Sequence, residues 1–372
     1  MIPVFRPSIT QEEIDAVTEV LKSGWIGLGP KTEEFEKEFA KFIGTKYAIG
    51  LNSATAGLHL AVKVLDISSG EIIVPAITFV TTAFAASYNN ATPVFADVYE
   101  DTLNIDVDDI RRKITDKTKA IIPVHFGGHP ADMDEINEIA KEHKLKVIED
   151  AAHACGATYR GRNAGTLGDM AVFSFHAVKN IGTGDGGAIT TNDEAAYERL
   201  KKLRWCGINK STFERSGKSY SWYYEVDEIG WKFHMNDIIA ALASVQLKRL
   251  EETNRRRREI AKMYKDGLSG LGWLELPVER NYVKSSFHNF VIKVEKRDEF
   301  MEFLGKKGVS TGVHYMPLYM HPVFKGMKSD APVADKVWKR LVTLPLYPDM
   351  TNKDVKMAID AIKEFGEAHK LS

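Results

Sequence analysis

The sequence predicts an α/β fold, in which helices cover both faces of a mostly parallel sheet and a smaller C-terminal α/β domain follows. Two observations lead to this prediction. Apolar, β-branched runs of strand length alternate with amphipathic runs of helix length between residues 47 and 191, as is typical of a parallel sheet. From about Asp237 the pattern becomes strongly helical, and a mixed unit follows. We therefore expect a large domain over residues 1–250 and a small domain over residues 251–372.

The first helix has recognisable ends. Thr10 and Glu13 have capping-box spacing, and Gly24 is a typical stop. Strands are predicted at residues 47–51, 71–75, 92–98, 119–126, 146–150, 170–175 and 188–191. Further helices are predicted at residues 31–44, 56–65, 78–88, 132–144, 237–268, 297–308 and 352–370. Within the long helix, we interpret the run Arg255 to Arg258 as a solvated face.

Composition excludes several classes of protein. The 372 residues are 44% hydrophobic and 27% charged, with a formal net charge of -1, so no general basic surface indicates nucleic-acid binding. The charge-free stretch between Glu71 and Asp97 contains Pro75 and two asparagines, which favours a buried core over a membrane span. Two cysteines do not indicate a disulfide framework, and no signal region is evident. We expect a cytoplasmic protein.

Ligands of open α/β sheets bind outside the carboxyl ends of the strands, and three such places stand out. The first is the turn Asn52 to Thr55, where a predicted strand ends and a helix begins near Ala56. Small residues and a helix N-terminus favour a bound phosphate. The same residue types also form ordinary helix caps, so both interpretations remain open here.

The second place is Asp150, at the end of an apolar strand. Its carboxylate could pair with a protonated ring nitrogen, or it could cap the turn that follows. His153 and Cys155 suggest a metal ligand pair, but no second pair has zinc-like spacing. We therefore predict no metal site.

The third place is the segment from Ser174 to Gly187, "SFHAVKNIGTGDGG". Gly182, Gly184 and Gly187 spell G-x-G-x-x-G, but a strand follows them, whereas a dinucleotide fingerprint opens a helix. Lys179 could hold a phosphate, pair with a carboxylate or form a Schiff base.

Taken together, the three places match one cofactor. Pyridoxal phosphate needs a lysine for its aldehyde, a carboxylate for its ring nitrogen and an anion site for its phosphate. Lys179, Asp150 and the turn Ser53 to Thr55 supply these groups. The glycines would let the backbone bend tightly after Lys179 and pass close to the cofactor or to a neighbouring chain.

The segments EDAAHACGA (149–157), SFHAVKNIGTGDGGAI (174–189) and NSATAGLHLA (52–61) resemble the DegT/DnrJ/StrS family of sugar aminotransferases, which are fold type I pyridoxal phosphate enzymes. The resemblance covers almost the whole chain. It implies amino transfer from an amino acid such as glutamate, through the pyridoxamine phosphate form, to a keto group of a nucleotide-linked sugar. Some family members are dehydratases with His in place of the lysine, so Lys179 favours an aminotransferase.

The resemblance also implies roles for residues around the ring. Lys179 would be the Schiff-base lysine and the proton carrier, and Asp150 would pair with the ring nitrogen. Phe79 would stack on one face of the ring, and Ala152 would lie against the other. His153 would lie near the phenolic oxygen, where many relatives carry Gln and some carry His.

For the phosphate, the resemblance implies Ser174 and the amides of Ala54 and Thr55, in the turn that starts at Ser53. The family more usually has Gly at the position of Ala54, which puts the geometry of this turn in doubt.

A homodimer with shared active sites is implied by "GWKFHMND" (230–237), which normally reaches the partner's phosphate. Relatives carry Asn or Arg where this chain has Lys232 and His234, so the sequence leaves open which of the two side chains reaches the partner's phosphate. Apolar and cationic residues alternate in this segment. If it is extended, the apolar side chains lie on one face and the cationic ones on the other. The substrate pocket is expected near Trp25, His314 and Tyr315.

Two other functions stay open at this point. One is the same reaction on a keto-cyclitol or a small phosphorylated ketone. The other is a non-catalytic regulator that binds pyridoxal phosphate, which the intact pair of Lys179 and Asp150 argues against.

Overall fold

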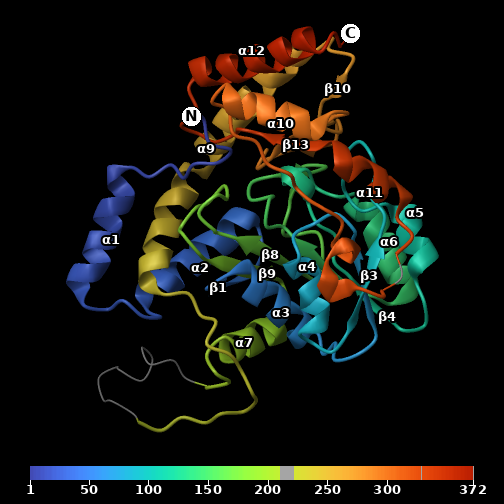
Figure 1. Cartoon of the computed structure of the whole chain (residues 1–372). Coiled ribbons are helices and arrows are strands. Elements are labelled where there is room, and N and C mark those ends of the chain that lie inside the picture. Colours follow the sequence, from blue (N-terminus) through green and yellow to red (C-terminus); the bar gives the residue numbers. More distant parts are fainter. Residues whose placement is uncertain (210–221, 328, 372) are drawn as a thin grey trace.

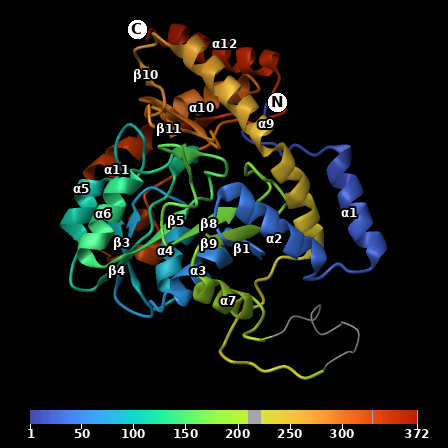
Figure 2. The same ribbon diagram turned by 180° about the vertical axis from the view of Figure 1, so that it is seen from behind.

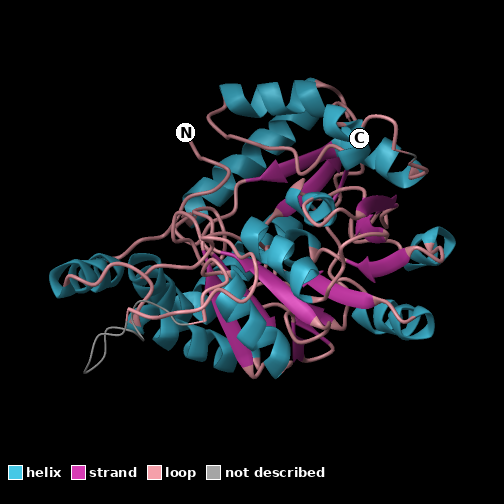
Figure 3. Ribbon diagram, turned by 90° about the horizontal axis from the view of Figure 1, so that it is seen from below, coloured by secondary structure: helices cyan, strands magenta, loops and turns pink. Residues whose placement is uncertain are grey.

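A seven-stranded sheet forms the centre of the molecule (Figures 1 and 3). The computed structural model describes residues 1–209, 222–327 and 329–371. The strand order is β1-β9-β8-β5-β4-β2-β3, and β9 alone runs antiparallel to its neighbours. This confirms the predicted, mostly parallel sheet. The strands are β1 (Tyr47–Leu51), β2 (Glu71–Pro75), β3 (Thr92–Ala96), β4 (Thr118–Ile121), β5 (Lys146–Asp150), β8 (Met170–Ser174) and β9 (Gly187–Thr191).

Helices cover both faces of this sheet because its strands are apolar on both sides. Ile72 and Val74 pack in one buried cluster, whereas Ile73 between them packs in another, as the two-residue period of a strand requires. One face carries α3 (Ala54–Val64), α4 (Thr81–Ser87) and α7 (Glu194–Leu203). The other carries α2 (Pro30–Ile43), α5 (Val107–Lys113) and α6 (Met133–His143).

Two helices lie outside these layers. Helix α1 (Gln11–Ser23) begins at the predicted capping box of Thr10 and Glu13 and ends at Gly24, which is left-handed. Helix α9 (Asp237–Leu268) packs against α1 and α2 near its start and against α12 (Asn352–Ala368) beyond (Figures 1 and 2). It crosses residue 250 without a break, so the division there stays a prediction.

The C-terminal part has its own small sheet and core. Its antiparallel strands are β10 (Leu274–Glu275), β12 (Phe290–Val294) and β13 (Leu341–Leu344), which pack with α10 (Arg297–Lys306) and α12. A further sheet consists of β6 (Thr158–Tyr159), β7 (Arg162–Asn163) and β11 (Val283–Lys284), and α11 (Pro332–Val337) lies near β3. Ile2 belongs to the C-terminal core, and Val4 accepts a backbone hydrogen bond from Leu346. The first residues of the chain therefore pack with its last third.

The interpretation of Arg255 to Arg258 as a solvated face is wrong for Arg257. Arg255 is paired with Glu259 at the surface, but Arg257 is buried and donates to the carbonyl oxygen of Leu346 at 3.1 Å. Helix α9 is packed on more than one side here, so one member of the run points inward. Among the described residues, no helix combines the length and apolar character needed to cross a membrane.

Candidate active site

The predicted site residues meet in one cleft because of the strand directions. Strands β1, β2, β5 and β8 are parallel to one another, so their carboxyl ends lie at the same edge of the sheet. A cleft of about 400 Å³ opens at this edge. The predicted residues that line it are Ser53, Ala54, Thr55, Phe79, Asp150, Ala152, His153, Ser174, Lys179, His314 and Tyr315.

Lys179 lies in a tight turn, five residues after the end of β8 at Ser174. Its backbone N–H donates to the carbonyl oxygen of His176 at 2.8 Å. Gly184 has a φ of 95°, which glycine adopts without strain. A Cβ atom at Gly187 would lie 2.6 Å from the nitrogen of Ala54, so only glycine fits there. Gly187 thus brings the chain that follows the lysine against the start of α3.

Burial shifts the protonation of the central pair in opposite directions. It lowers the pKa of Lys179 to about 8, although the nearby Asp150 charge opposes this shift. It raises the pKa of the Asp150 carboxyl. With its pKa this close to neutral pH, the Lys179 amine can both take up and release a proton.

Hydrogen bonds oppose the effect of burial on Asp150. The Thr82 hydroxyl donates to its Oδ2 at 2.8 Å, and the amide of Ala152 donates to its Oδ1 at 3.2 Å. Both bonds favour the carboxylate form. The neighbouring Glu149 has a different setting: it accepts from the amides of Leu167 and Gly168 and pairs with the buried His125 on the other side of the strand. Asp150 is therefore the carboxylate of this strand that lines the cleft.

The turn after β1 has both features left open by the sequence, a helix cap and a place for a phosphate. The Ser53 hydroxyl accepts from the amide of Ala56 at 3.1 Å, so this side chain caps α3. Helix α3 begins at Ala54, two residues earlier than predicted. The amides of Ala54 and Thr55 therefore lie in its first turn, where backbone N–H groups have no acceptor within their own helix. Ser174 lines the same cleft from the end of β8.

Aromatic and imidazole groups form the other side of the cleft. The Nδ1 atom of His153 accepts from the amide of Gly127 at 3.3 Å, and its Nε2 lies 3.4 Å from the Tyr315 hydroxyl. His314 Nδ1 is 2.7 Å from the Thr343 hydroxyl. Burial lowers the pKa of His153 well below its usual value and that of His314 to about 4. Both rings are therefore neutral near pH 7.

Phe79 is a large apolar side chain left open at the cleft. It is 54% exposed, and its ring centre lies 6.2 Å from that of Tyr315. Core packing therefore does not account for this ring, and an aromatic surface remains available to a flat ligand.

Three predicted residues do not line the cleft of their own chain. Trp25 donates from Nε1 to the carbonyl oxygen of Leu28. Lys232 lies over the ring of Trp205 with Nζ 4.0 Å from its centre, and His234 meets the same ring edge-on at 4.4 Å. Met235, the next residue, is fully buried.

Three residues that sequence reasoning did not select complete the site: Thr82, His288 and Phe5. Thr82 contacts Asp150, and His288 lies beside Lys179. Phe5 stacks on His288. No spacing connects these residues to the motifs, because they come from α4, from the N-terminal segment and from the stretch just before β12.

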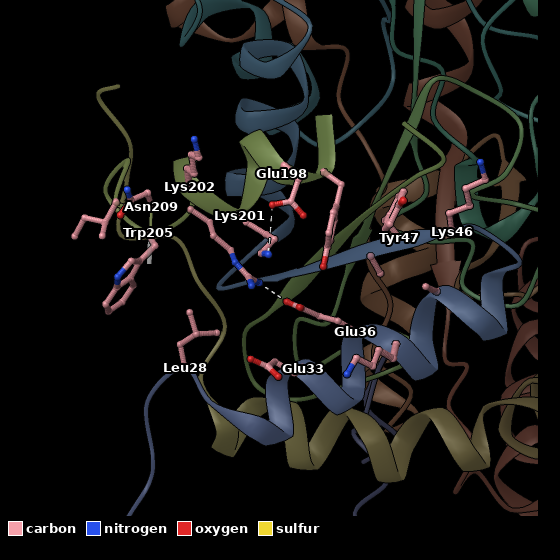
Figure 4. A pocket seen from close by; sticks show the side chains of 16 residues that line it. Leu28, Glu33, Glu36, Lys46, Tyr47, Glu198, Lys201, Lys202, Trp205 and Asn209 are labelled. Carbon is pink, nitrogen blue, oxygen red and sulfur yellow. Dashed lines mark hydrogen bonds and ion pairs between the residues drawn. The ribbon is translucent and has the colours of Figure 1, made fainter. Parts of the chain in front are cut away.

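A second cleft, of about 520 Å³, lies between α2, α7 and the edge strand β1 (Figure 4). Two ion pairs lie within it, Glu36 with Arg204 and Glu198 with Lys201. It holds none of the predicted cofactor residues. The chemistry predicted from the motifs therefore belongs to the cleft around Lys179.

Comparison with known proteins places the chain in a family. Residues 7–363 match the DegT/DnrJ/EryC1/StrS aminotransferase family. The chain belongs to this family. It is 45% identical to an uncharacterized protein of Methanocaldococcus jannaschii, over 98% of this chain and 97% of that one. It is 42% identical to the spore coat polysaccharide biosynthesis protein SpsC of Bacillus subtilis, over 98% and 96%.

The fold of this family member also matches solved aminotransferases. A putative sugar aminotransferase from Streptococcus pneumoniae, in its pyridoxamine phosphate form, superposes with a TM-score of 0.93 at 33% identity. The match covers 99% of this chain and 100% of that one. The predicted fold type I architecture is thereby confirmed, and the protein is a pyridoxal phosphate-dependent aminotransferase.

The residues of the cleft fit this cofactor. A lysine of lowered pKa, a buried carboxylate and a helix N-terminus surround one space, and an exposed aromatic ring borders it. These are the groups that an aldehyde, a ring nitrogen, a phosphate and a flat ring require.

Proposed function

We propose that the protein transfers an amino group from glutamate, through pyridoxal phosphate, to a keto group of a nucleotide-linked sugar. The observation that carries this proposal is the meeting of Lys179, Asp150 and the first turn of α3 in one cleft. The family supports amino transfer, and two relatives bear on the acceptor: one is named for spore coat polysaccharide biosynthesis, and another is described as a putative sugar aminotransferase.

Each group at the cleft has a distinct task in this proposal. When bound, the cofactor supplies an electron sink that stabilises the negative charge left as a proton leaves carbon. Lys179, with Nζ free, would take up and release the transferred proton, for which a pKa of about 8 suits it. Asp150 would pair with the ring nitrogen, and the amides of Ala54 and Thr55, with Ser174, would hold the phosphate.

The aromatic and imidazole side chains would orient the ring. Phe79 would stack on one face of the ring, and Ala152 would lie against the other. The neutral His153 would donate a hydrogen bond to the phenolic oxygen. His314 and Tyr315 border the space left for the substrate.

The assignment of Lys179 has a direct test. The purified protein is expected to be yellow, and borohydride should attach the cofactor covalently to Lys179, as located by peptide mass spectrometry. Lys179→Ala should lower amino transfer by on the order of a thousandfold or more, because the proton carrier is lost, while cofactor is still retained. An adduct on another lysine would overturn the assignment.

The substrate is tested by a screen of keto-sugar nucleotides against several amino donors, read as the mass change from ketone to amine. We expect the highest kcat/KM with glutamate and a nucleotide-linked keto-sugar. Turnover confined to a keto-cyclitol or a small phosphorylated ketone would replace the sugar. A protein that binds cofactor but turns over no donor would instead be a regulator.

A further inference from the structure

A buried histidine from the C-terminal part of the chain lies beside the lysine of the cleft. His288 precedes β12, and its Nε2 atom is 3.4 Å from Nζ of Lys179. It is only 2% exposed, yet it lines the cleft. The two residues are 109 positions apart, so the packing of the C-terminal part against the large sheet creates this contact.

The His288 ring is held in one orientation by two other rings. Phe5 stacks on it with ring centres 5.4 Å apart and planes within 7°. His153 packs against it at 4.4 Å. A ring clamped in this way cannot rotate freely, so Nε2 remains directed at the lysine.

The hydrogen-bonding capacity of this ring also points to Lys179. The Nδ1 atom of His288 is buried without a hydrogen-bond partner among the described residues. The lysine is therefore the polar neighbour that the ring engages. A protonated Nζ can only donate, so Nε2 must be the acceptor when the lysine is charged.

The surroundings keep the imidazole neutral and able to accept. Burial lowers the pKa of His288 well below its usual value, and the positive charge of Lys179 adds to this shift. The other titratable groups around the two residues are Asp150, His153, Arg257 and His314.

We propose that His288 is a positioning residue that accepts a hydrogen bond from Nζ of free Lys179 and holds it toward the cleft. This inference rests on the proposed function of Lys179. A neutral acceptor stabilises the ammonium form relative to the amine, so His288 offsets part of the effect of burial on the lysine. It also fixes the direction from which Nζ takes and returns a proton.

The test measures when free Lys179 becomes reactive. In cofactor-free full-length protein, the rate of pyridoxal phosphate capture is followed by absorbance as a function of pH, and borohydride then locates the adduct. The wild-type midpoint is expected near pH 8. His288→Phe keeps a ring against Phe5 but removes the acceptor. It should lower the midpoint by about one unit, a tenfold change in the protonation equilibrium.

Two further variants and a control make the result decisive. His288→Leu also removes the acceptor and should shift the midpoint in the same direction. It serves as the test if the Phe variant does not fold. His288→Gln keeps an acceptor oxygen and should restore the midpoint most of the way. His59→Gln changes another buried histidine with an unpartnered ring nitrogen, outside this cleft, and should leave the midpoint unchanged.

Turnover supplies an independent reading. His288→Phe should lower kcat about tenfold with little change in KM for the donor, because the proton transfer rather than binding is affected. If the variants without an acceptor keep the wild-type midpoint and the adduct is still on Lys179, the inference about His288 is wrong. The proposed function is not affected by that result. An adduct on another lysine in the wild-type protein would instead overturn the proposed function.

Discussion

Asp150 combines a buried position with two hydrogen-bond donors that favour its charge. Asp150→Asn keeps the size of the side chain and removes that charge. We expect kcat to fall by roughly a hundredfold or more, since the ring nitrogen loses its anionic partner, while substrate affinity changes little. Steady-state kinetics with saturating cofactor measures this. Turnover close to that of the wild type would mean that Asp150 does not serve the ring.

Thr82 predicts a pH effect through the same carboxylate. Its hydroxyl lowers the pKa of Asp150, so Thr82→Val should raise that pKa. The carboxylate would then protonate at a higher pH, and the acid limb of kcat/KM should move upward. At pH values well above the acid limbs of the wild type and the Val variant, the kcat/KM values of the two proteins should converge. Thr82→Ser keeps the hydroxyl and is the matched control; equal acid limbs in the Val and Ser variants would contradict the prediction.

At the scale of elements, the start of α3 depends on the close approach of β9. A Cβ atom at Gly187 would meet the nitrogen of Ala54 at 2.6 Å and the carbonyl carbon of Ser53 at 2.7 Å. Gly187→Ala must therefore displace the first turn of α3. We expect at least a tenfold weaker affinity for pyridoxal phosphate and a loss of about 1–3 kcal/mol in the free energy of unfolding. Equilibrium binding and thermal unfolding measure the two effects.

Gly305 provides the control for this change. It lies within α10, where an added Cβ would meet nothing within 4 Å. Gly305→Ala should leave cofactor affinity unchanged and stabilise the helix by up to about 1 kcal/mol. If Gly187→Ala also left the affinity for pyridoxal phosphate unchanged, the close packing of β9 on α3 would not be needed for phosphate binding.

At the scale of the whole molecule, Lys232 and His234 remain candidates for a contact with a partner subunit. They lie against Trp205, outside the cleft of their own chain. We predict a homodimer in which these residues reach the partner's phosphate site. In a two-fold dimer each subunit offers the same patch to the other, so complementation can test it.

The experiment mixes two inactive proteins, Lys179→Ala and the double variant Lys232→Ala with His234→Ala. In a mixed dimer, one site carries both lesions and the other carries neither, so part of the activity should return. Subunit exchange is checked independently by mass spectrometry of the mixture. Exchange without recovered activity would exclude the shared site for these two residues.

The sequence by itself determined the layered fold and the core of the site. The apolar, β-branched run of β2 and the capping box of α1 are local patterns, and the structure confirms the strand and the helix start that they predict. Lys179, Asp150 and the turn at Ser53 were predictable because each lies at or shortly after the carboxyl end of a strand, and parallel strands end at one edge of the sheet.

Only the tertiary structure decided which distant residues join them. Phe5, near the N-terminus, and His288, in the C-terminal part of the chain, meet beside the lysine, and Arg257 turns inward within a charged run. Trp25 was expected at the cleft but does not line it. No local pattern encodes these positions, because they depend on how the C-terminal part packs against the large sheet. Periodicity specifies the face of an element, whereas the neighbour on that face is set by contacts between residues far apart in the chain.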